Sequence, residues 1–299
     1  MDVYRTPEER FQDLPGYPFE PHYAEIDGMR MHYLDEGGGD PILLLHGEPD
    51  WSYLYRKMIP LLAPAFRVVA PDYFGFGRSD KPTDIAWYTY DRHTASIAAL
   101  IEKLDLRGIT VVVQDWGGPI GLRVATEMKD RFARLVVLNT GLMSPGDAGW
   151  PTEGFINWRN FAERVGLDMP VGKIMQGSCA TELGATTLAA YEAPWPTRES
   201  KAGVAAFPLL VPIREDDPGT DEMRRVRDQL RSWPIPALVL FSDADPVFRP
   251  EVGQWFADQL PGAQGKMDTI AGASHMLQED KGEEVAVRIL DWVGTAPTA

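Results

Sequence analysis

The feature that most constrains the fold is an apolar run that leads into a turn of small residues and then into a helical pattern. The run Ile109–Val113 is followed by the turn Gln114–Gly118, and the sequence predicts a helix from Pro119 to about Lys129. A strand, a tight turn and a helix in this order form an elbow that raises its central residue, Asp115, above the edge of a sheet. Two glycines close the turn where backbones approach closely, although Val113 stands where another glycine is expected.

Short apolar runs and helical patterns alternate on both sides of this elbow. Strands are expected at Met29–Leu34, Pro41–Leu45, Phe66–Ala70, Ile109–Val113, Leu135–Asn139, Ala237–Phe241 and Lys266–Ile270. Helices are expected at Tyr90–Leu104, Pro119–Lys129, Val252–Leu260 and Glu283–Val293. Strands that alternate with helices predict an α/β fold with a mainly parallel sheet and helices on both faces.

The alternation is interrupted between Gly141 and about Trp233, where proline, glycine, methionine and tryptophan are frequent and no strong strand pattern occurs. We interpret this stretch as a helical cap inserted into one core domain. The predicted cap spans residues 143–218, and the predicted core consists of residues 1–142 and 219–299. Such an insertion would lie over the carboxyl ends of the strands, where open α/β sheets bind ligands.

The charge and cysteine content exclude several classes of partner. The chain has 44 acidic and 29 basic side chains, and its net charge of −15 would repel nucleic acid and anionic lipid. The single cysteine, Cys179, cannot form an intramolecular disulfide or a cysteine-rich metal site. The N-terminus lacks a signal-peptide stretch, and the longest apolar runs are too short to span a bilayer. We therefore expect a cytoplasmic protein with no nucleic-acid or membrane partner.

The aspartate at the elbow limits the chemistry that a site there could perform. A serine that displaced a group such as halide from an alkyl carbon would form an ether, which water does not readily cleave. An aspartate forms an ester instead, and water can hydrolyse an ester at its carboxyl carbon. Aspartate is also ionised at neutral pH, with a reference pKa of about 3.9, and needs no base to attack. In isolation Asp115 would more often be a helix cap, so its assignment as nucleophile depends on the rest of the site.

A histidine and an acid follow in the order that an α/β-hydrolase requires. His275 comes just after the last predicted strand, and Asp245 comes just after the preceding one. We expect His275 to be the base that activates water, and Asp245 to orient its ring and stabilise its positive charge. Asp243 is the competing acid, but Asp245 is favoured because Pro246 fixes the turn directly behind it.

A loop with the sequence His46-Gly47-Glu48-Pro49 follows the strand that ends at Leu45. Its backbone can supply an oxyanion donor opposite the elbow, so the N–H groups of Glu48 and Trp116 form the expected oxyanion hole. We interpret His46 as a structural residue of the loop, because His275 already occupies the catalytic position in the chain order.

These segments resemble haloalkane dehalogenases along nearly the whole chain, from about Tyr17 to Asp291. The most specific matches are His46–Arg56, Gly75–Pro82 and Gln114–Gly118. The resemblance implies an α/β-hydrolase fold with a helical cap, and an aspartate that displaces halide with inversion at carbon. It also implies that indole N–H groups hold the released halide.

Two tryptophans match the halide-binding positions of this family. Trp116 matches the first, and an indole suits the role because it only donates hydrogen bonds and surrounds the ion with apolar surface. Trp158 fits the second, because Gly154–Trp158 resembles the family's Gly-Phe-x-x-Trp segment. Trp150 and Trp195 are the other tryptophans of the insertion and remain alternatives.

Other positions resemble one subfamily in particular. Glu48 stands where the other common pattern has a halide-binding asparagine, which implies that the second halide ligand is in the cap. Asn139 is not an acid, so the resemblance leaves the acid role to Asp245. Within the cap, Phe207-Pro208 and Val211 resemble family positions that line the cavity, although packing alone would also explain them.

Three competing functions share the fold. An epoxide hydrolase would use the same nucleophile but typically needs a pair of cap tyrosines, and Tyr191 is the only tyrosine in the insertion. A fluoroacetate-type dehalogenase needs cationic side chains for a carboxylate, and the core motifs offer none next to Asp115. A non-catalytic binding protein on this fold would not need an intact Asp115, Asp245 and His275.

The expected partners are therefore small molecules. The sequence contains no phosphate-binding glycine motif and no metal-ligand cluster, so no cofactor and no metal are expected. We expect a small apolar halogenated substrate, water and a halide product, and a monomeric protein. The substrate's chain length, the preferred leaving group and the enantioselectivity depend on cavity shape, which the sequence does not define.

Overall fold

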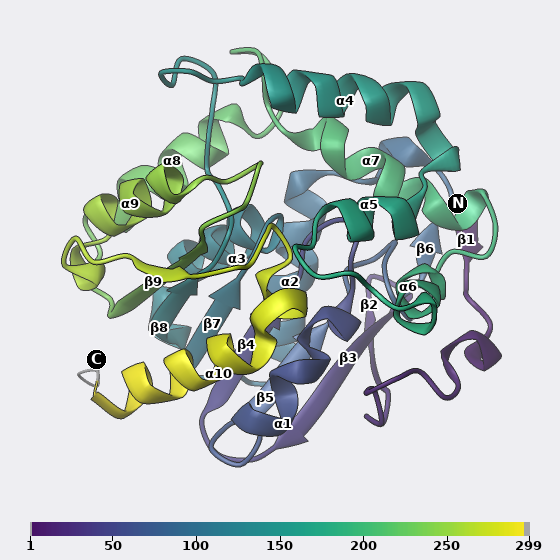
Figure 1. The fold of residues 1–299 in the computed structure, drawn as a ribbon, viewed down its shortest axis with the longest axis horizontal. Coiled ribbons are helices and arrows are strands. Elements are labelled where there is room, and N and C mark those ends of the chain that lie inside the picture. Colours follow the sequence, from purple (N-terminus) through teal and green to yellow (C-terminus); the bar gives the residue numbers. More distant parts are fainter. Residues whose placement is uncertain (1, 296–299) are drawn as a thin grey trace.

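A computed structural model describes residues 2–295 (Figure 1). Within these residues the main feature is an eight-stranded sheet with the order β10-β9-β8-β7-β4-β5-β3-β2. Its strands are β2 (His22–Ile26), β3 (Met29–Gly37), β4 (Pro41–Leu45), β5 (Arg67–Pro71), β7 (Ile109–Val113), β8 (Phe132–Val137), β9 (Ala237–Ser242) and β10 (Asp268–Ile270). A separate antiparallel pair consists of β1 (Val3–Tyr4) and β6 (Lys81–Pro82).

The sheet is mainly parallel, which confirms the predicted fold class. All neighbouring strands from β10 to β5 are parallel. At the other end of the sheet, β3 pairs antiparallel with both β5 and the edge strand β2. In the centre β4 and β7 lie side by side, with Leu45 opposite Val113. The loop at His46 and the elbow at Asp115 follow these two strands, so they meet at the same edge of the sheet.

Helices cover both faces of the sheet (Figure 1). On one face α1 (Ile59–Leu62) packs against α10 (Leu277–Thr295). On the other face each helix contacts the next in a row of α2 (Tyr90–Lys103), α3 (Gly117–Glu127), α8 (Thr220–Arg231) and α9 (Pro250–Gln259). None of the helices within residues 2–295 is long and apolar enough to cross a bilayer.

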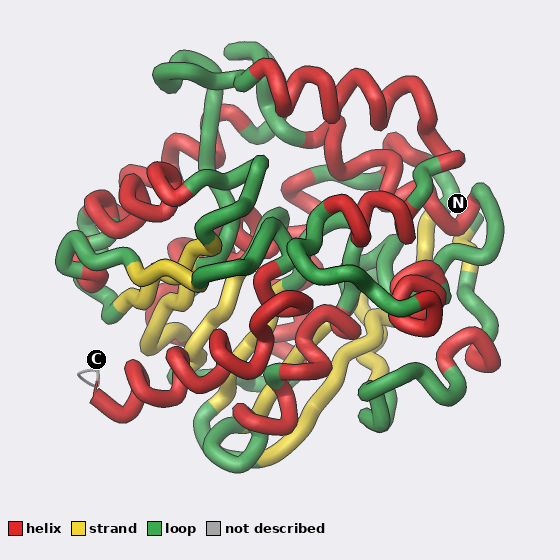
Figure 2. Tube along the Cα trace, viewed as in Figure 1, coloured by secondary structure: helices red, strands yellow, loops and turns green. Residues whose placement is uncertain are grey.

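The stretch between β8 and β9 is helical, in agreement with the sequence pattern. Residues 138–236 are all described and contain no strand (Figure 2). Besides α8, this stretch contains α4 (Glu153–Val165), α5 (Val171–Gly177), α6 (Ala185–Glu192) and α7 (Ala202–Leu210). Here α4 packs against α7 and α5 packs against α6. α8 instead packs against α3 and α9 of the core.

Some predicted boundaries are wrong, for local reasons. The last helix begins at Leu277, whereas the prediction places its start at Glu283. The prediction misses the first turn because this turn is polar and a kink at Lys281 (φ −139°, ψ 34°) separates it from the rest of the helix. The helix after the elbow begins at Gly117, two residues before Pro119, because the turn passes directly into it. The strand before Asn139 ends at Val137, and β2 is a strand that the sequence pattern does not predict.

Candidate active site

Asp115 stands at the turn between β7 and α3. Its backbone φ is +47°, in the left-handed region that L-residues rarely adopt. The Asp115 N–H donates to the Asn139 carbonyl at 2.7 Å, and the Asp115 carbonyl accepts from the Gly118 N–H at 2.9 Å. The same carbonyl accepts from the Thr140 hydroxyl at 2.6 Å. An unusual backbone held by several bonds is typical of a functional position.

Small residues allow other backbones to approach this turn. A Cβ on Gly47 would lie 2.4 Å from the Cβ of Asp115, so the loop after β4 needs glycine there. A Cβ on Gly121 would lie 2.7 Å from Cγ1 of Val113. Val113 is therefore accommodated in place of the expected glycine because the helix that packs on it supplies the small residue instead.

His275 and Asp245 face each other at the ends of neighbouring loops. The Nδ1 of His275 lies 3.0 Å from Oδ2 of Asp245, and both side chains are buried. The other oxygen of Asp245 accepts from the Val247 N–H at 2.7 Å. Asp243 is directed elsewhere, since it accepts from the Gly272 N–H at 2.9 Å. Of the two candidate acids, the structure thus places Asp245 against the histidine.

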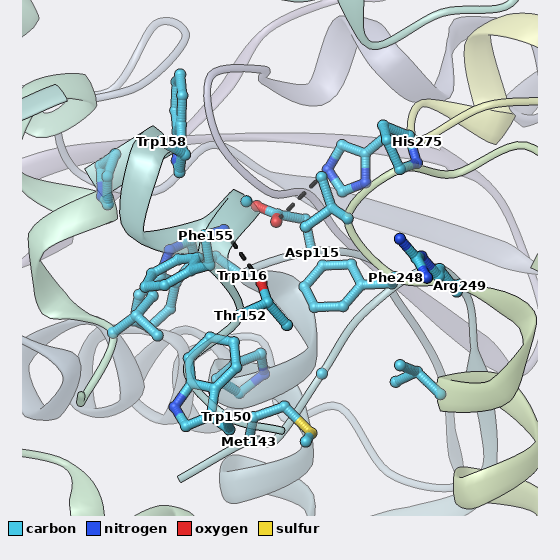
Figure 3. Close-up of a pocket in the computed structure, with 18 of the residues that line it drawn as sticks. Asp115, Trp116, Met143, Trp150, Thr152, Phe155, Trp158, Phe248, Arg249 and His275 are labelled. Atoms are coloured by element: carbon cyan, nitrogen blue, oxygen red, sulfur yellow. Dashed lines mark hydrogen bonds and ion pairs between the residues drawn. The ribbon is translucent and has the colours of Figure 1, made fainter. Parts of the chain in front are cut away.

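The opposite side of the His275 ring faces the elbow. Its Nε2 lies 3.6 Å from Oδ2 of Asp115, and Figure 3 shows the carboxylate directed towards the ring. Burial by itself would lower the pKa of His275, but the charges of Asp245 and Asp115 and their hydrogen bonds raise it well above its ordinary value. The two carboxylates therefore favour the protonated form of the histidine.

One of the two expected oxyanion donors faces the carboxylate. The Glu48 N–H donates to Oδ1 of Asp115 at 2.8 Å. Among the hydrogen bonds of residues 2–295, none joins the Trp116 N–H to this carboxylate, so its participation stays a prediction. His46 lies away from the carboxylate: its Nε2 accepts from the Tyr73 N–H at 3.1 Å, and its Nδ1 lies 2.8 Å from the Gly47 carbonyl.

The carboxyl group of Glu48 is a second acidic feature near the nucleophile. Burial raises the pKa of Glu48 well above its ordinary value, and the charges of Asp115 and Asp50 add to this shift. Its Oε1 has no hydrogen-bond partner within the described residues. Glu48 is thus a buried acid at the floor of the site whose surroundings favour its neutral form, a role for the side chain that sequence reasoning did not assign.

Sequence reasoning also missed two residues whose side chains bind the backbone of the loop that carries His275. The side-chain amide of Asn139 donates to the carbonyls of Ser274 and His275 at 3.0 and 3.2 Å. Its oxygen accepts from the Ser242 N–H at 2.9 Å. Gln114 donates to the His275 carbonyl at 3.3 Å. The sequence marks Asn139 only as a position without an acid, and the position of Gln114 inside the elbow motif is its only signal.

A cavity of about 950 Å³ opens above these groups. It is lined by the elbow and the oxyanion loop, by the loop after Asp245, and by the segment that leads into α4. Its larger side chains include Trp116, Met143, Trp150, Phe155, Trp158, Phe248 and Arg249, all labelled in Figure 3. Glu48, Asp115 and His275 also line it. The cavity therefore joins the reactive groups to a largely apolar enclosure.

The three tryptophans of the insertion differ in the partner of their indole N–H. Trp150 lines the cavity but donates to the Pro212 carbonyl at 3.1 Å. Trp195 donates to the Gly75 carbonyl at 3.0 Å and is outside the cavity lining. Trp158 lines the cavity, and no hydrogen bond engages its indole among the described residues.

The cap positions for which the sequence leaves cavity lining and packing open differ in their surroundings. Pro208 and Val211 line the cavity, but Phe207 does not. Phe207 is fully buried and packs edge-on against Trp116, with ring centroids 5.2 Å apart. The cavity rim also holds a cation, Arg249, which sequence reasoning missed because it lies far from the elbow in the chain.

The buried tyrosine of the insertion is bound outside the cavity. Tyr191 donates to Oε2 of Glu279, and its ring is fully buried. It therefore cannot donate a proton to a ligand beside Asp115. Within residues 2–295 no group of three His, Cys, Asp or Glu side chains could hold a metal ion.

The fold and the elbow with its acid and histidine define an α/β-hydrolase. In agreement, residues 40–282 match the family model described as the alpha/beta hydrolase fold. A haloalkane dehalogenase of Mycobacterium marinum is 46% identical over 300 residues, covering 98% of this chain and 100% of the relative. Haloalkane dehalogenase 1 of Mycobacterium tuberculosis is 47% identical, covering 98% and 99%. The chain belongs to the haloalkane dehalogenase family.

A solved structure agrees with this assignment. The haloalkane dehalogenase DpaA of Paraglaciecola agarilytica superimposes with a TM-score of 0.90 at 36% identity, covering 97% of this chain and 98% of that one. The similarity therefore includes the helical insertion as well as the sheet.

Proposed function

We propose that this protein hydrolyses the carbon–halogen bond of small haloalkanes, with Asp115 as the covalent nucleophile. The observation that carries the proposal is the position of the Asp115 carboxylate. Oδ1 is held by the Glu48 N–H and Oδ2 faces His275, at the floor of a cavity lined by Trp116 and Trp158. The products would be an alcohol, which is primary for terminal haloalkanes, and halide.

In the first step Oδ2 of Asp115 would attack the carbon that bears the halogen. The new carbon–oxygen bond forms as the carbon–halogen bond breaks, and the halide leaves with the bonding electron pair. Oδ2 is the better candidate because Oδ1 is engaged by the Glu48 N–H. The indole N–H groups of Trp116 and Trp158 would hold the departing halide, since an indole donates without accepting.

In the second step a water molecule would attack the ester at the carboxyl carbon of Asp115. His275 takes a proton from this water, and Asp245 stabilises the resulting imidazolium. Oδ1 carries the developing negative charge and accepts a hydrogen bond from the Glu48 N–H. The imidazolium then protonates the leaving alkoxide, which leaves Asp115 as a carboxylic acid that carries the second proton of the water. Ionisation of this acid restores the nucleophile, so the whole cycle consumes water and yields alcohol, halide and a proton.

The charges around His275 make the two steps compatible. In the free enzyme Asp245 and Asp115 raise the pKa of His275. Alkylation turns Asp115 into a neutral ester and removes one of these charges, so the pKa of His275 falls and the ring can release its proton. The histidine would thus become a base only after the ester has formed.

Epoxide hydrolysis is the alternative with the same nucleophile, and it is not favoured. It needs a proton donor for the opening epoxide oxygen. The hydroxyl of Tyr191 is engaged by Glu279 outside the cavity, and no tyrosine lines the cavity within the described residues.

The cap, the assembly and the cellular location are further parts of the proposal. We propose that residues 143–218 act as the cap, with α8 belonging to the core that it packs against. We also propose a monomer in the cytoplasm. The similar DpaA is described as tetrameric, so light scattering coupled to size-exclusion chromatography tests the monomer directly.

The proposal is tested by incubating the purified protein with 1,2-dibromoethane, 1-bromobutane and styrene oxide. We expect bromide release from the bromoalkanes, no diol from styrene oxide, and no bromide release by an Asp115→Ala variant that remains folded by circular dichroism. Diol formation without bromide release would contradict the proposal and favour the epoxide hydrolase.

A further inference from the structure

The loop that carries His275 is bound to the insertion by the first turn of α10. Asp280, in this turn, is a half-buried carboxylate whose two oxygens are both used. Oδ2 accepts from the Ser274 N–H at 2.9 Å, directly before His275 in the chain. The same oxygen accepts from the Ala180 N–H at 2.9 Å, in the loop between α5 and α6.

The second oxygen of Asp280 is bound only to the insertion. Oδ1 accepts from the Thr181 N–H at 2.9 Å and from the Thr181 hydroxyl. A further backbone bond joins the same two loops, because the Met276 N–H donates to the Ser178 carbonyl at 2.9 Å. Ser178 lines the cavity. The loop after α5 and the loop before α10 therefore lie side by side, as Figure 2 also shows.

We propose that Asp280 is a positioning residue for His275. Through Asp280, the position of the insertion against the His275 loop controls hydrolysis of the alkyl-enzyme. We call Asp280 with its partners Ser274, Ala180 and Thr181 the Asp280 clamp. Charge-assisted bonds to backbone N–H groups fix a loop more strongly than neutral bonds. Asn139 holds the His275 loop from the sheet side, and the Asp280 clamp holds it from the side of the insertion.

The two chemical steps depend on the clamp differently. Attack by Asp115 needs the elbow and the indoles that would hold the halide, and the hydrogen bonds of the Asp280 clamp reach neither the elbow nor Trp158. Activation of water needs the His275 ring at a defined distance from the carboxyl carbon, and small misplacements of a reacting group are costly. Loss of the clamp should therefore slow hydrolysis selectively. This inference rests on the proposed function, since it requires an ester on Asp115.

Single-turnover measurements with 1,2-dibromoethane test the proposal. Rapid quenching and mass spectrometry follow the formation and the decay of the alkyl group on Asp115. In Asp280→Ala we expect formation at the wild-type rate and decay that is about tenfold slower. Because only competent enzyme becomes alkylated, partial unfolding lowers the amount of ester but does not change its rate of decay.

Three further variants separate positioning from general stability. Asp280→Asn keeps one acceptor oxygen and should show an intermediate decay rate. Thr181→Val removes only the hydroxyl donor, so decay should stay within about twofold of the wild-type rate. Asp217→Ala is the matched control, because Asp217 accepts from the N–H groups of Ile213 and Arg214 within the insertion and its bonds do not reach the His275 loop. It should change neither step.

Hydrogen exchange gives a readout that is independent of activity. The amides of Ser274 and Ala180 should exchange faster in Asp280→Ala than in the wild-type protein, and those of the elbow should not. Equal slowing of formation and decay in Asp280→Ala, or no slowing of decay, would overturn the proposal. A wild-type protein that forms no ester on Asp115 would instead overturn the proposed function itself.

Discussion

The Nε2 of His275 lies 3.6 Å from Oδ2 of Asp115, while its Nδ1 lies 3.0 Å from Asp245. The ring thus stands between the proposed nucleophile and the proposed acid. Because His275 is needed only for the second step, its removal should stop the cycle after the ester has formed.

The first prediction concerns His275→Ala. With 1-bromobutane this variant should release bromide once and then accumulate Asp115 with the added mass of a butyl group. Peptide mass spectrometry locates the modification. Asp243→Ala is the control, since Asp243 is bonded to the Gly272 N–H rather than to the histidine, and it should keep turning over. A His275→Ala protein without any mass increment would contradict the two-step mechanism.

The second prediction concerns pH. Asp245 and Asp115 raise the pKa of His275 in the free enzyme, and alkylation removes the Asp115 charge. The pKa of His275 in the alkyl-enzyme should therefore lie below that in the free enzyme. Hydrolysis needs the neutral ring, so its rate should rise with pH through this lower pKa.

Alkylation needs no proton transfer, so the ester should accumulate at pH values below the pKa of His275 in the alkyl-enzyme. The steady-state amount of alkylated Asp115, measured by acid quenching between about pH 5 and pH 9, should fall as pH rises. An amount that does not depend on pH would count against His275 as the base.

The third prediction separates two tryptophans that both line the cavity. The indole of Trp158 has no partner among the described residues, whereas that of Trp150 donates to the Pro212 carbonyl. Trp158→Phe should weaken bromide binding at least about tenfold, because a hydrogen bond to a charged group contributes about 1.5–3 kcal/mol. Trp150→Phe is the matched control and should leave bromide affinity unchanged. Isothermal titration with sodium bromide measures both. A larger loss in Trp150→Phe would reassign the halide site.

The sequence is most informative where a strand is buried on both faces. All residues of β4 and β7 are buried, and their runs, apolar except for Thr110, predict both strands to the residue. β2 escapes prediction because it is an edge strand with exposed positions. The predicted start of α10 is wrong because residues of its first turn bind the insertion loops, and such tertiary contacts have no local sequence signal.

Part of the candidate site is also predictable from the sequence. Asp115, Asp245 and His275 are identifiable because each follows a strand in the expected order, and the structure brings them together. The roles of Asn139 and Asp280 are not predictable, because their partners lie far away in the chain. For Phe207 the sequence leaves cavity lining and packing open, because sequence spacing does not tell which face of α7 meets the cavity.

The fourth prediction concerns the buried ion pair next to the Asp280 clamp. Glu279 accepts from Arg56 at 2.8 Å and from the Tyr191 hydroxyl, which ties the core to the insertion. Burial alone would raise the pKa of Glu279, but these partners lower it to about 2, from an ordinary value of 4.5. A depressed carboxylate pKa stabilises the fold fully above pH 4.5, and this stabilisation is lost as pH falls towards 2.

Glu279→Gln should therefore lower the free energy of unfolding by about 3 kcal/mol at pH 7, because it leaves Arg56 buried without its charged partner. The difference from wild type should be smaller at pH 3. Urea unfolding at both pH values measures it. Glu163→Gln, at an exposed position of α4, is the control and should change stability by less than about 0.5 kcal/mol. A deficit that is the same at both pH values would show that the ion pair is not its source.

The covalent role of Asp115 is tested most directly by a single turnover in ¹⁸O-labelled water with enzyme in excess over 1-bromobutane. Hydrolysis at the carboxyl carbon places the label in the Asp115 side chain, and the butanol keeps an unlabelled oxygen from the aspartate. We predict ¹⁸O in the peptide that contains Asp115 and unlabelled butanol. Labelled butanol with an unlabelled peptide would mean that water attacks the substrate directly, and would contradict covalent catalysis by Asp115.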